Sequence, residues 1–415
     1  MGMGYRGSTV VVLILLFVSS SIYSVRLGVD RVTPALIAHL TPHCISPRVG
    51  LITNQTGIST CGKRTVDILK SRGFNIVKLF APEHGFAGVI RAGDGCANTK
   101  DGVTGIPVIS LYRSGGNAVV GGKSINPEDL LDVDLLLFDI QDSGMRHYTY
   151  ISTLYCVLDA AGKYNLPVVI LDRPNPLGAV MEGPLVDDHL RSFIGIAPIP
   201  VRHGMTVGEL ARYFVRYSLL CKPKIFVVVM KEYFRDQGLT HFLAPLSPNI
   251  QAHDAVKGYS FLGLLGEIGP FDVGVGTPHA FSVIALVHDS PYNKPIFWKK
   301  LIIILKKHTI SARPIVYMRD KNKYTGISLS IADVNKVSTI RVLHDLLNFF
   351  KKAGITFLYR KGFDKAIGIS EFRDYYEGSI EHKILLKKIN TALYVFFEKA
   401  RKVCIYRPLP QLIFL

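Results

Sequence analysis

The stretch VDLLLFDIQD, residues 133–142, carries the pattern that decides the fold of this chain. Its leucine-rich apolar run ends in a polar cluster that contains Asp139 and Asp142. Short apolar runs without alternation are typical of strands that are covered on both faces of a parallel sheet. The same pattern occurs five times in the first 175 residues, at 49–57, 76–85, 108–113, 133–142 and 168–176.

The spacing of these runs predicts an α/β fold. Their ends recur about every thirty residues, which is the length of one strand, one helix and two loops. Residues 65–71 and 150–164 are expected to form two of the crossover helices. Because parallel strands place their C-terminal ends on one edge of a sheet, the five polar clusters should meet where open α/β sheets bind ligands.

The length of the chain, 415 residues, predicts two domains, with a boundary near residue 220. Cys221-Lys222-Pro223 is followed by a buried strand at 225–230 and then by a loop-rich, glycine-rich region. The predicted domains are therefore 25–220 and 221–415.

The N-terminus predicts export. Arg6 precedes an apolar stretch, Val10 to Val18, which is too short to span a bilayer and is followed by serines up to Ser24. This pattern is typical of a signal peptide at residues 1–24, and a buried strand or an uncleaved anchor are the alternatives. We expect a periplasmic or secreted protein with no membrane span after cleavage.

The net charge of +17 is concentrated in the C-terminal part, where residues 294–415 carry 24 Lys and Arg against nine Asp and Glu. Attraction to an anionic polymer or a membrane surface is one interpretation, and a solvated lysine-rich surface is the other. No aromatic RNP-like or zinc-finger pattern supports a nucleic-acid partner. The six cysteines are scattered, which argues against a structural zinc site.

Several common motifs are absent from the sequence. No G-x-G-x-x-G follows the first strand, and GGKS at 121–124 lacks the earlier glycine of a phosphate-binding loop. No G-x-S-x-G elbow or H-E-x-x-H helix occurs. We therefore expect neither a dinucleotide cofactor nor serine-hydrolase or zincin chemistry.

Carboxylates dominate the predicted sheet edge. Glu83 follows a strand directly, and a carboxyl group that is partly shielded from water there can act as a general acid. Asp139, Asp142 and Asp172 end neighbouring strands and are candidates for the second carboxylate that glycoside hydrolysis needs. The alternative is that these aspartates cap helices or pair with nearby arginines.

Basic and aromatic side chains lie beside these acids. A guanidinium group can hold a substrate carboxylate in a two-pronged contact, and the candidates are Arg146, Arg173 and Arg202. Tyr148 offers a flat apolar face and a hydroxyl to a sugar ring. His84 and His203 are possible metal ligands, but they lack a third spaced partner, so no metal site is predicted.

Six motifs in order resemble one known family. They are VGLITNQTG (49–57), LFAPEHG (79–85), FDIQD (138–142), Arg146 with YTY (148–150), LDRPNP (171–176) and PVRHGMT (200–206). Together they resemble the exo-β-N-acetylmuramidase family of glycoside hydrolases. The resemblance implies a Rossmann-like parallel-sheet catalytic domain, a smaller α/β domain that completes the cleft, and release of N-acetylmuramic acid from the non-reducing end of peptidoglycan fragments.

On this resemblance Glu83 matches the catalytic glutamate proposed for the family. The predicted catalytic group comprises Glu83, His84, Asp139 and Asp142. The predicted substrate-binding group comprises Asn54, Arg146, Tyr148, Asp172, Arg173, Asn175, Arg202 and His203. From charge, we expect Arg146 or Arg202 to hold the lactyl carboxylate that distinguishes muramic acid from glucosamine.

The sequence also departs from the family pattern. EIGP at 267–270 and GVGT at 274–277 stand where the family usually shows Glu-Gly-Thr-Asn and Gly-Arg-Gly-Thr, and His147 replaces an aromatic residue. We therefore expect the second domain to contribute differently to the cleft. Two alternatives stay open: a glycan-binding protein with weakened catalysis, and a metal-assisted hydrolase that uses His84, His203 and an aspartate.

Overall fold

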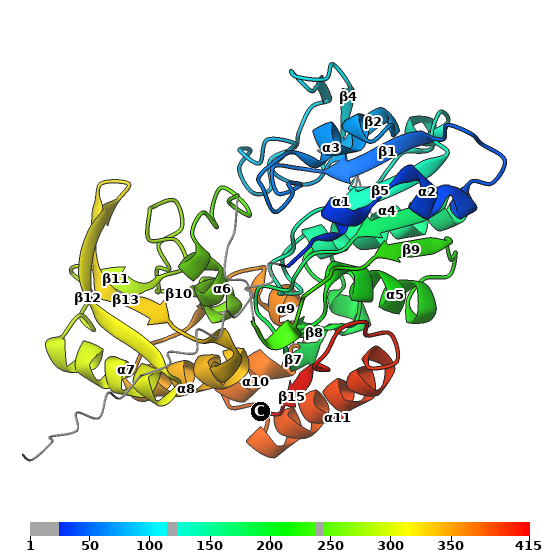
Figure 1. Ribbon diagram of the computed structural model, residues 1–415. Helices are drawn as coiled ribbons and strands as arrows, with labels where there is room; N and C mark the ends of the chain where they lie inside the picture. The colour runs from blue at the N-terminus through cyan, green and yellow to red at the C-terminus, as the bar shows by residue number, and fades with distance from the viewer. Residues whose placement is uncertain (1–24, 114–122, 238–243) are drawn as a thin grey trace, which may run out of the picture.

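The computed structural model describes residues 25–113, 123–237 and 244–415 (Figure 1). The predicted signal peptide, residues 1–24, lies outside this range. No helix among the described residues is long and apolar enough to cross a membrane.

A seven-stranded sheet forms the core of the first lobe, and it confirms the predicted α/β class. Its strands lie in the order β3-β4-β2-β1-β5-β6-β9, and all pairs are parallel except β3 with β4. The strands are β1 (Arg48–Thr53), β2 (Asn75–Ala81), β3 (Thr99–Lys100), β4 (Pro107–Ser110), β5 (Leu135–Asp139), β6 (Val168–Leu171) and β9 (Ile225–Val228). The five apolar runs of the sequence are β1, β2, β4, β5 and β6.

Successive residues of these strands enter two different cores. Ile52, Phe80 and Phe138 pack in the cluster that contains α4 (Tyr150–Lys163) and α5 (Val207–Tyr217). The residues one position earlier, Leu51, Leu79 and Leu137, pack in the cluster of α1 (Gly28–Arg31) and α3 (Thr65–Ser71). Because helices cover both faces, the strands are apolar throughout. The short helix α2 (Pro34–Ile37) follows α1.

The strand order reverses beside β1. From β1 the chain proceeds outward through β2 and β4 in one direction, and later through β5, β6 and β9 in the other. This is the order of a doubly wound fold, in which the loops after the two central strands separate and leave a crevice. That crevice faces the second lobe.

The second lobe is built on a three-stranded antiparallel sheet with the order β11-β13-β12 (Figure 1). Its strands are β11 (Val283–Val287), β12 (Ile310–Arg319) and β13 (Asn322–Ile331), and a two-stranded pair joins β10 (Ile268–Gly269) to β14 (Leu358–Tyr359). Its helices are α6 (His253–Leu265), α7 (Pro295–Lys307), α8 (Thr339–Lys352), α9 (Phe363–Ile367) and α10 (Glu371–Glu377).

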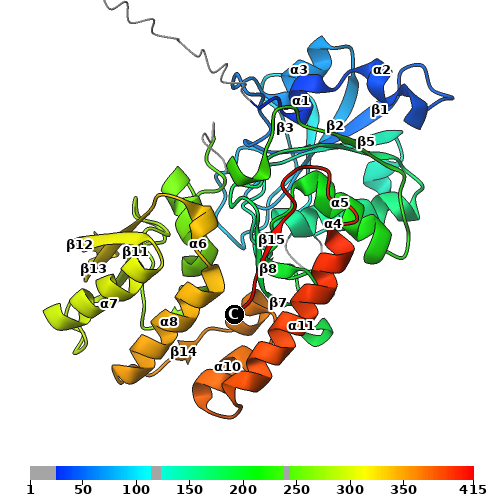
Figure 2. The same cartoon turned by 60° about the horizontal axis from the view of Figure 1, so that its bottom comes forward.

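A third small sheet returns the end of the chain to the first half. It has the order β15-β7-β8, with β7 (Val180–Leu185), β8 (Pro200–Arg202) and β15 (Gln411–Ile413). The long helix α11 (His382–Ala400) packs on β7 (Figure 2). The expected boundary near residue 220 precedes β9, which is the last strand of the large sheet. The change of composition after Cys221 therefore marks a loop within the first lobe.

Candidate active site

A cavity of about 380 Å³ lies where the two lobes meet. Its walls come from loops that follow strands of the large sheet and from the region around α6 and β10. The ionisable and aromatic residues that line it are Glu83, His84, His147, Tyr148, Tyr259, Glu267, Phe271, Asp272, Phe281, Arg319 and Arg360. Of the twelve predicted site residues, Glu83, His84 and Tyr148 reach this cavity.

Glu83 lies two residues beyond the end of β2 and is 6% exposed. Its Oε1 accepts a hydrogen bond of 2.8 Å from the backbone N–H of Gly93, which orients the carboxyl group. The neighbouring His84 adopts a left-handed backbone conformation with φ 71°, and its Nδ1 lies 2.7 Å from the carbonyl oxygen of Ile90. Left-handed non-glycine residues are uncommon and cluster at functional sites.

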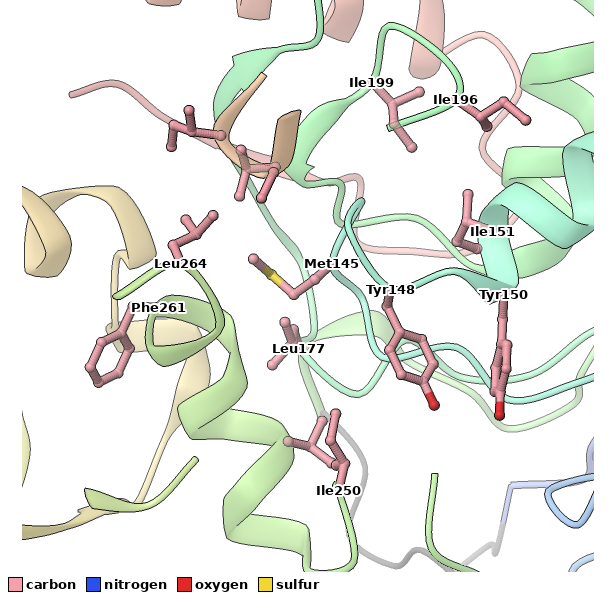
Figure 3. Close-up of a cluster of buried hydrophobic side chains, with 14 of the residues drawn as sticks. Met145, Tyr148, Tyr150, Ile151, Leu177, Ile196, Ile199, Ile250, Phe261 and Leu264 are labelled. Atoms are coloured by element: carbon pink, nitrogen blue, oxygen red, sulfur yellow. The ribbon is translucent and has the colours of Figure 1, made fainter. Parts of the chain in front are cut away.

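Two tyrosines support the cavity from the first lobe. The hydroxyls of Tyr148 and Tyr150 both donate to the carbonyl oxygen of Leu246, at 2.7 and 3.2 Å. Figure 3 shows the two rings side by side with their hydroxyls directed the same way. Because the Tyr148 hydroxyl has this partner, its ring face is the part that remains for a ligand.

The strand-end aspartates have structural partners instead of facing the cavity. Asp139 forms a buried ion pair with Arg173, in which Nη2 lies 2.8 Å from Oδ2. Asp172 accepts hydrogen bonds of 2.8 Å from the Gly208 N–H and from the hydroxyls of Thr206 and Tyr406. Burial raises the pKa of Asp172 to about 6. The alternative of helix capping and arginine pairing therefore describes Asp139, Asp172 and Arg173.

Asp142 and His203 form a second buried pair. His203 Nε2 lies 3.1 Å from Asp142 Oδ2, and His203 Nδ1 accepts from the Met205 N–H at 3.2 Å. Nε2 therefore carries the proton that is donated to Asp142. Neither residue lines the cavity. Among the residues that the structure describes, no group of three His, Cys, Asp or Glu side chains is placed to hold a metal ion.

The two arginines expected to bind the substrate carboxylate are buried elsewhere. The Arg146 guanidinium donates to the carbonyl oxygens of Pro184, Ile199 and Ala366 at 2.6, 2.7 and 2.8 Å, and burial lowers its pKa to about 9.

Arg202 pairs with Glu182 at 3.1 Å and donates to the carbonyl oxygen of Val337 at 2.8 Å. Arg146 and Arg202 are 1% and 0% exposed, so their positions contradict the expected contact with a substrate. Each instead cross-links β7 and β8 to later parts of the chain.

The side chains of Asn54 and Asn175 stabilise turns by local hydrogen bonds. Asn54 Oδ1 accepts from the N–H and the hydroxyl of Thr56 at 3.0 and 2.6 Å. Asn175 donates to the carbonyl oxygen of Met205 at 3.0 Å and accepts from the Leu177 N–H at 2.9 Å. Both asparagines are buried and neither lines the cavity, so the structure gives them a role in loop geometry.

The second lobe supplies cavity residues that are not among the twelve predicted site residues, although Glu267 belongs to the EIGP stretch compared with the family pattern. Glu267 lies between α6 and β10, and burial raises the pKa of its carboxyl group while Arg360 opposes the shift. Asp272 is already occupied, because it pairs with Arg319 and accepts a hydrogen bond from the Tyr317 hydroxyl.

His147 reaches the cavity from the loop between β5 and α4 of the first lobe, and its ring meets that of Tyr259 of α6 at a centroid distance of 4.8 Å. Burial lowers its pKa to about 3, so the ring is neutral.

Arg360 differs from the other cations of the cavity. Its backbone N–H donates to the carbonyl oxygen of Glu267 at 2.9 Å, which places it beside β10. Within the described ranges, its exposed guanidinium makes no ion pair and no hydrogen bond. Arg319, by contrast, is neutralised by Asp272. No sequence motif distinguishes Arg360 from the other basic residues of the C-terminal part, because only the pairing of β10 with β14 brings it to the cavity.

Comparisons with known proteins identify relatives of this chain. Residues 49–254 match the model of the N-terminal part of exo-β-N-acetylmuramidase NamZ. The peptidoglycan β-N-acetylmuramidase NamZ of Bacillus subtilis (strain 168) is 32% identical over 400 residues, which cover 92% of this chain and 91% of that protein.

Two crystal structures of DUF1343 family proteins from Bacteroides fragilis NCTC 9343 are similar in fold. The first is 29% identical with a TM-score of 0.75, and the second is 24% identical with a TM-score of 0.69. Each comparison covers 92% of this chain and 99% of the other.

Proposed function

Because this chain belongs to the exo-β-N-acetylmuramidase NamZ family, we propose that it is a glycosidase that releases N-acetylmuramic acid from the non-reducing end of peptidoglycan fragments. The observation that carries this proposal is the position of Glu83. Its carboxyl group is largely shielded from water and belongs to a cavity of about 380 Å³, a volume that suits one sugar ring with its substituents.

The proposed chemistry uses two carboxyl groups. Glu83 transfers a proton at the oxygen of the scissile glycosidic bond. Glu267 is our candidate for the second group, because it reaches the cavity from the facing lobe and Asp272 is occupied by Arg319 and Tyr317. The aromatic residues of the cavity provide apolar surface for the sugar ring, and they are Tyr148, Tyr259, Phe271 and Phe281.

We assign recognition of the lactyl carboxylate to Arg360 in place of Arg146 and Arg202. The acidic Glu83 and Glu267 would make the cavity unfavourable for the carboxylate of a substrate unless a cation such as a guanidinium group offsets their charge. Arg360 is suited to this role because its charge is not already paired, as the charge of Arg319 is.

The proposal includes export. A signal peptide at residues 1–24 is supported by Arg6, by the apolar stretch after it and by the serines that follow. Export would bring the protein to its substrate, because peptidoglycan lies outside the cytoplasm. N-terminal sequencing of the mature protein tests this part: a start near residue 25 in a periplasmic or secreted fraction supports export, and an intact N-terminus in the cytoplasm contradicts it.

The decisive experiment is Glu83→Gln assayed on a chromogenic β-glycoside of N-acetylmuramic acid. We expect kcat to fall by roughly 10²–10⁴-fold, because proton transfer to the leaving oxygen is lost. Calorimetry should show that binding of the free sugar is retained. Asp94→Asn is the matched control, since Asp94 is an exposed carboxylate on the same loop and should leave kcat unchanged.

Two outcomes would favour other functions. Sugar binding by the wild-type protein without detectable hydrolysis would indicate a glycan-binding protein. Hydrolysis that is abolished by a chelator and unaffected by Glu83→Gln would indicate metal-assisted chemistry.

A further inference from the structure

Helix α7 has an outward face that the fold does not use. Its sequence, PIFWKKLIIILKK, buries Phe297, Trp298, Leu301 and Leu305 against the second lobe. The opposite face presents Ile296 and Ile303, which are 57% and 60% exposed. Lys299 and Lys300 lie between these isoleucines at helical spacing, and the helix contains no acidic residue.

The lysines of this face are not neutralised. Lys299, Lys300, Lys306 and Lys307 are all exposed, and within the described ranges none of them makes an ion pair. Other lysines of the protein do have carboxylate partners, such as Lys163 with Asp159 at 2.7 Å. The positive charge of α7 therefore faces solvent without a counter-charge.

A groove of about 370 Å³ continues this face between α7 and the end of α8. Its apolar lining includes Tyr292, Phe297 and Phe349. Its basic residues are Lys294, Lys300 and Lys352. The groove thus combines apolar side chains with ammonium groups, as the α7 face does.

This surface is separate from the cavity. No residue between 282 and 318 lines the cavity, whereas α7 and the groove lie in residues 291–307 and 349–353. Figures 1 and 2 both place α7 at the outer end of the second lobe, far from the large sheet. The proposed hydrolysis therefore does not explain why this face combines exposed lysines with exposed apolar side chains.

We propose that the α7 face and the adjoining groove dock on the surface of a bilayer that contains anionic phospholipid. The lysines complement the phosphate headgroups, and the exposed isoleucines enter the boundary between headgroups and acyl chains. A water-soluble polyanion would need the lysines alone, so the exposed isoleucines and the apolar groove favour a membrane. This inference does not rest on the proposed hydrolase activity.

The single tryptophan of the chain, Trp298, provides a local probe because it lies in α7. The full chain is mixed with vesicles of phosphatidylglycerol and phosphatidylcholine whose acyl chains carry bromine, a short-range quencher. We expect quenching of Trp298 fluorescence that weakens as salt is raised, and little quenching with phosphatidylcholine alone. Vesicle binding that persists unchanged when the exposed lysines and isoleucines of α7 are both replaced would overturn the proposal, because another segment would then carry the binding.

Two variants separate charge from apolar insertion. Lys299→Gln/Lys300→Gln/Lys306→Gln/Lys307→Gln should weaken vesicle binding at least tenfold, since each lysine near an anionic surface contributes roughly fivefold. Ile296→Ser/Ile303→Ser should reduce Trp298 quenching at unchanged charge. The matched control is Val103→Ser/Leu131→Ser, which removes two exposed apolar side chains from the first lobe and should bind like the wild type.

All these substitutions lie outside the cavity, so hydrolysis of a soluble substrate should not change. If the isoleucine variant binds vesicles as tightly as the wild type does, the face is an electrostatic site for soluble polyanions and not a membrane-docking surface.

Discussion

The role proposed for Arg360 makes one residue responsible for separating two similar sugars. Its guanidinium lines the cavity and has no acidic partner among the described residues. The guanidinium groups of Arg146 and Arg202, in contrast, donate hydrogen bonds to backbone carbonyl oxygens. A cation that is already satisfied gains little from a substrate carboxylate, whereas an unpaired one gains a charge-assisted hydrogen bond.

We expect Arg360→Gln to lower kcat/KM on the N-acetylmuramic acid glycoside roughly tenfold to a hundredfold, which corresponds to one charged hydrogen bond. The low activity expected on the matching N-acetylglucosamine glycoside should stay the same. Steady-state kinetics on both glycosides give the ratio of their kcat/KM values. Lys361→Gln is the control, because Lys361 is exposed and does not line the cavity. An equal loss on both sugars would contradict carboxylate recognition by Arg360.

At the scale of the elements, two buried carboxylates, Asp172 and Glu209, connect the end of β6 to the start of α5. Helix α5 begins with a capping box, in which the Thr206 hydroxyl accepts from the Glu209 N–H and Glu209 accepts from the Thr206 N–H. Local sequence could reveal this pair because its members are three residues apart. It could not reveal that Glu209 also pairs with Arg235 at 2.6 Å, since that contact depends on the folded chain.

Asp172 at this junction predicts a pH dependence of stability. Its pKa is raised by burial to about 6 in the folded state, from 3.8, so between these values the folded protein binds more protons than the unfolded chain does. The free energy of unfolding should therefore fall as the pH rises from 4 to 6, by up to about 3 kcal/mol from this group.

Urea titrations at several pH values, compared between the wild type and Asp172→Asn, measure this contribution. Between pH 4 and 6 the free energy of unfolding of Asp172→Asn should fall less than that of the wild type. Asp94→Asn should show the same fall as the wild type, because Asp94 is exposed. Parallel pH profiles for the wild type and Asp172→Asn would contradict the assignment.

At the scale of the whole molecule, the sequence predicted one wall of the cavity and not the other. The strands of the first lobe are short buried runs followed by polar clusters, so the strands and Glu83 could be found by pattern. The opposite wall comes from Glu267, Asp272, Arg319 and Arg360, which lie in or beside short or antiparallel elements far apart in the chain. Apart from Glu267, which belongs to the EIGP stretch, no local pattern marks them, because β10 and β14 are two residues each.

The polar clusters at the strand ends do not all serve a ligand, for a related reason. Residues at strand ends meet at one edge, as expected, but most of them bind each other. Asp139 with Arg173 and Asp142 with His203 illustrate this. Sequence shows which groups converge, and only burial and hydrogen bonding show which of them remain available to a ligand.

Because the cavity needs both lobes, Glu267→Gln should reduce kcat by roughly 10²-fold or more while the protein remains folded. The loss should appear in kcat more than in KM, as expected for a group that acts in the transition state. Asp289→Asn, an exposed carboxylate of the same lobe, is the control. Full activity of Glu267→Gln would assign the second carboxyl role to another residue.

The return of residues 406–413 to the first lobe bears on how the protein folds. Tyr406 donates its hydroxyl to Asp172 and accepts from the Met230 N–H at 2.8 Å, and β15 lies alongside β7. The large sheet therefore remains without part of its support until residues 406–413 have left the ribosome. The hydrogen bond between Tyr406 and Asp172 joins residues 234 positions apart in the sequence, and contacts of such long range are the ones that slow the folding of a chain.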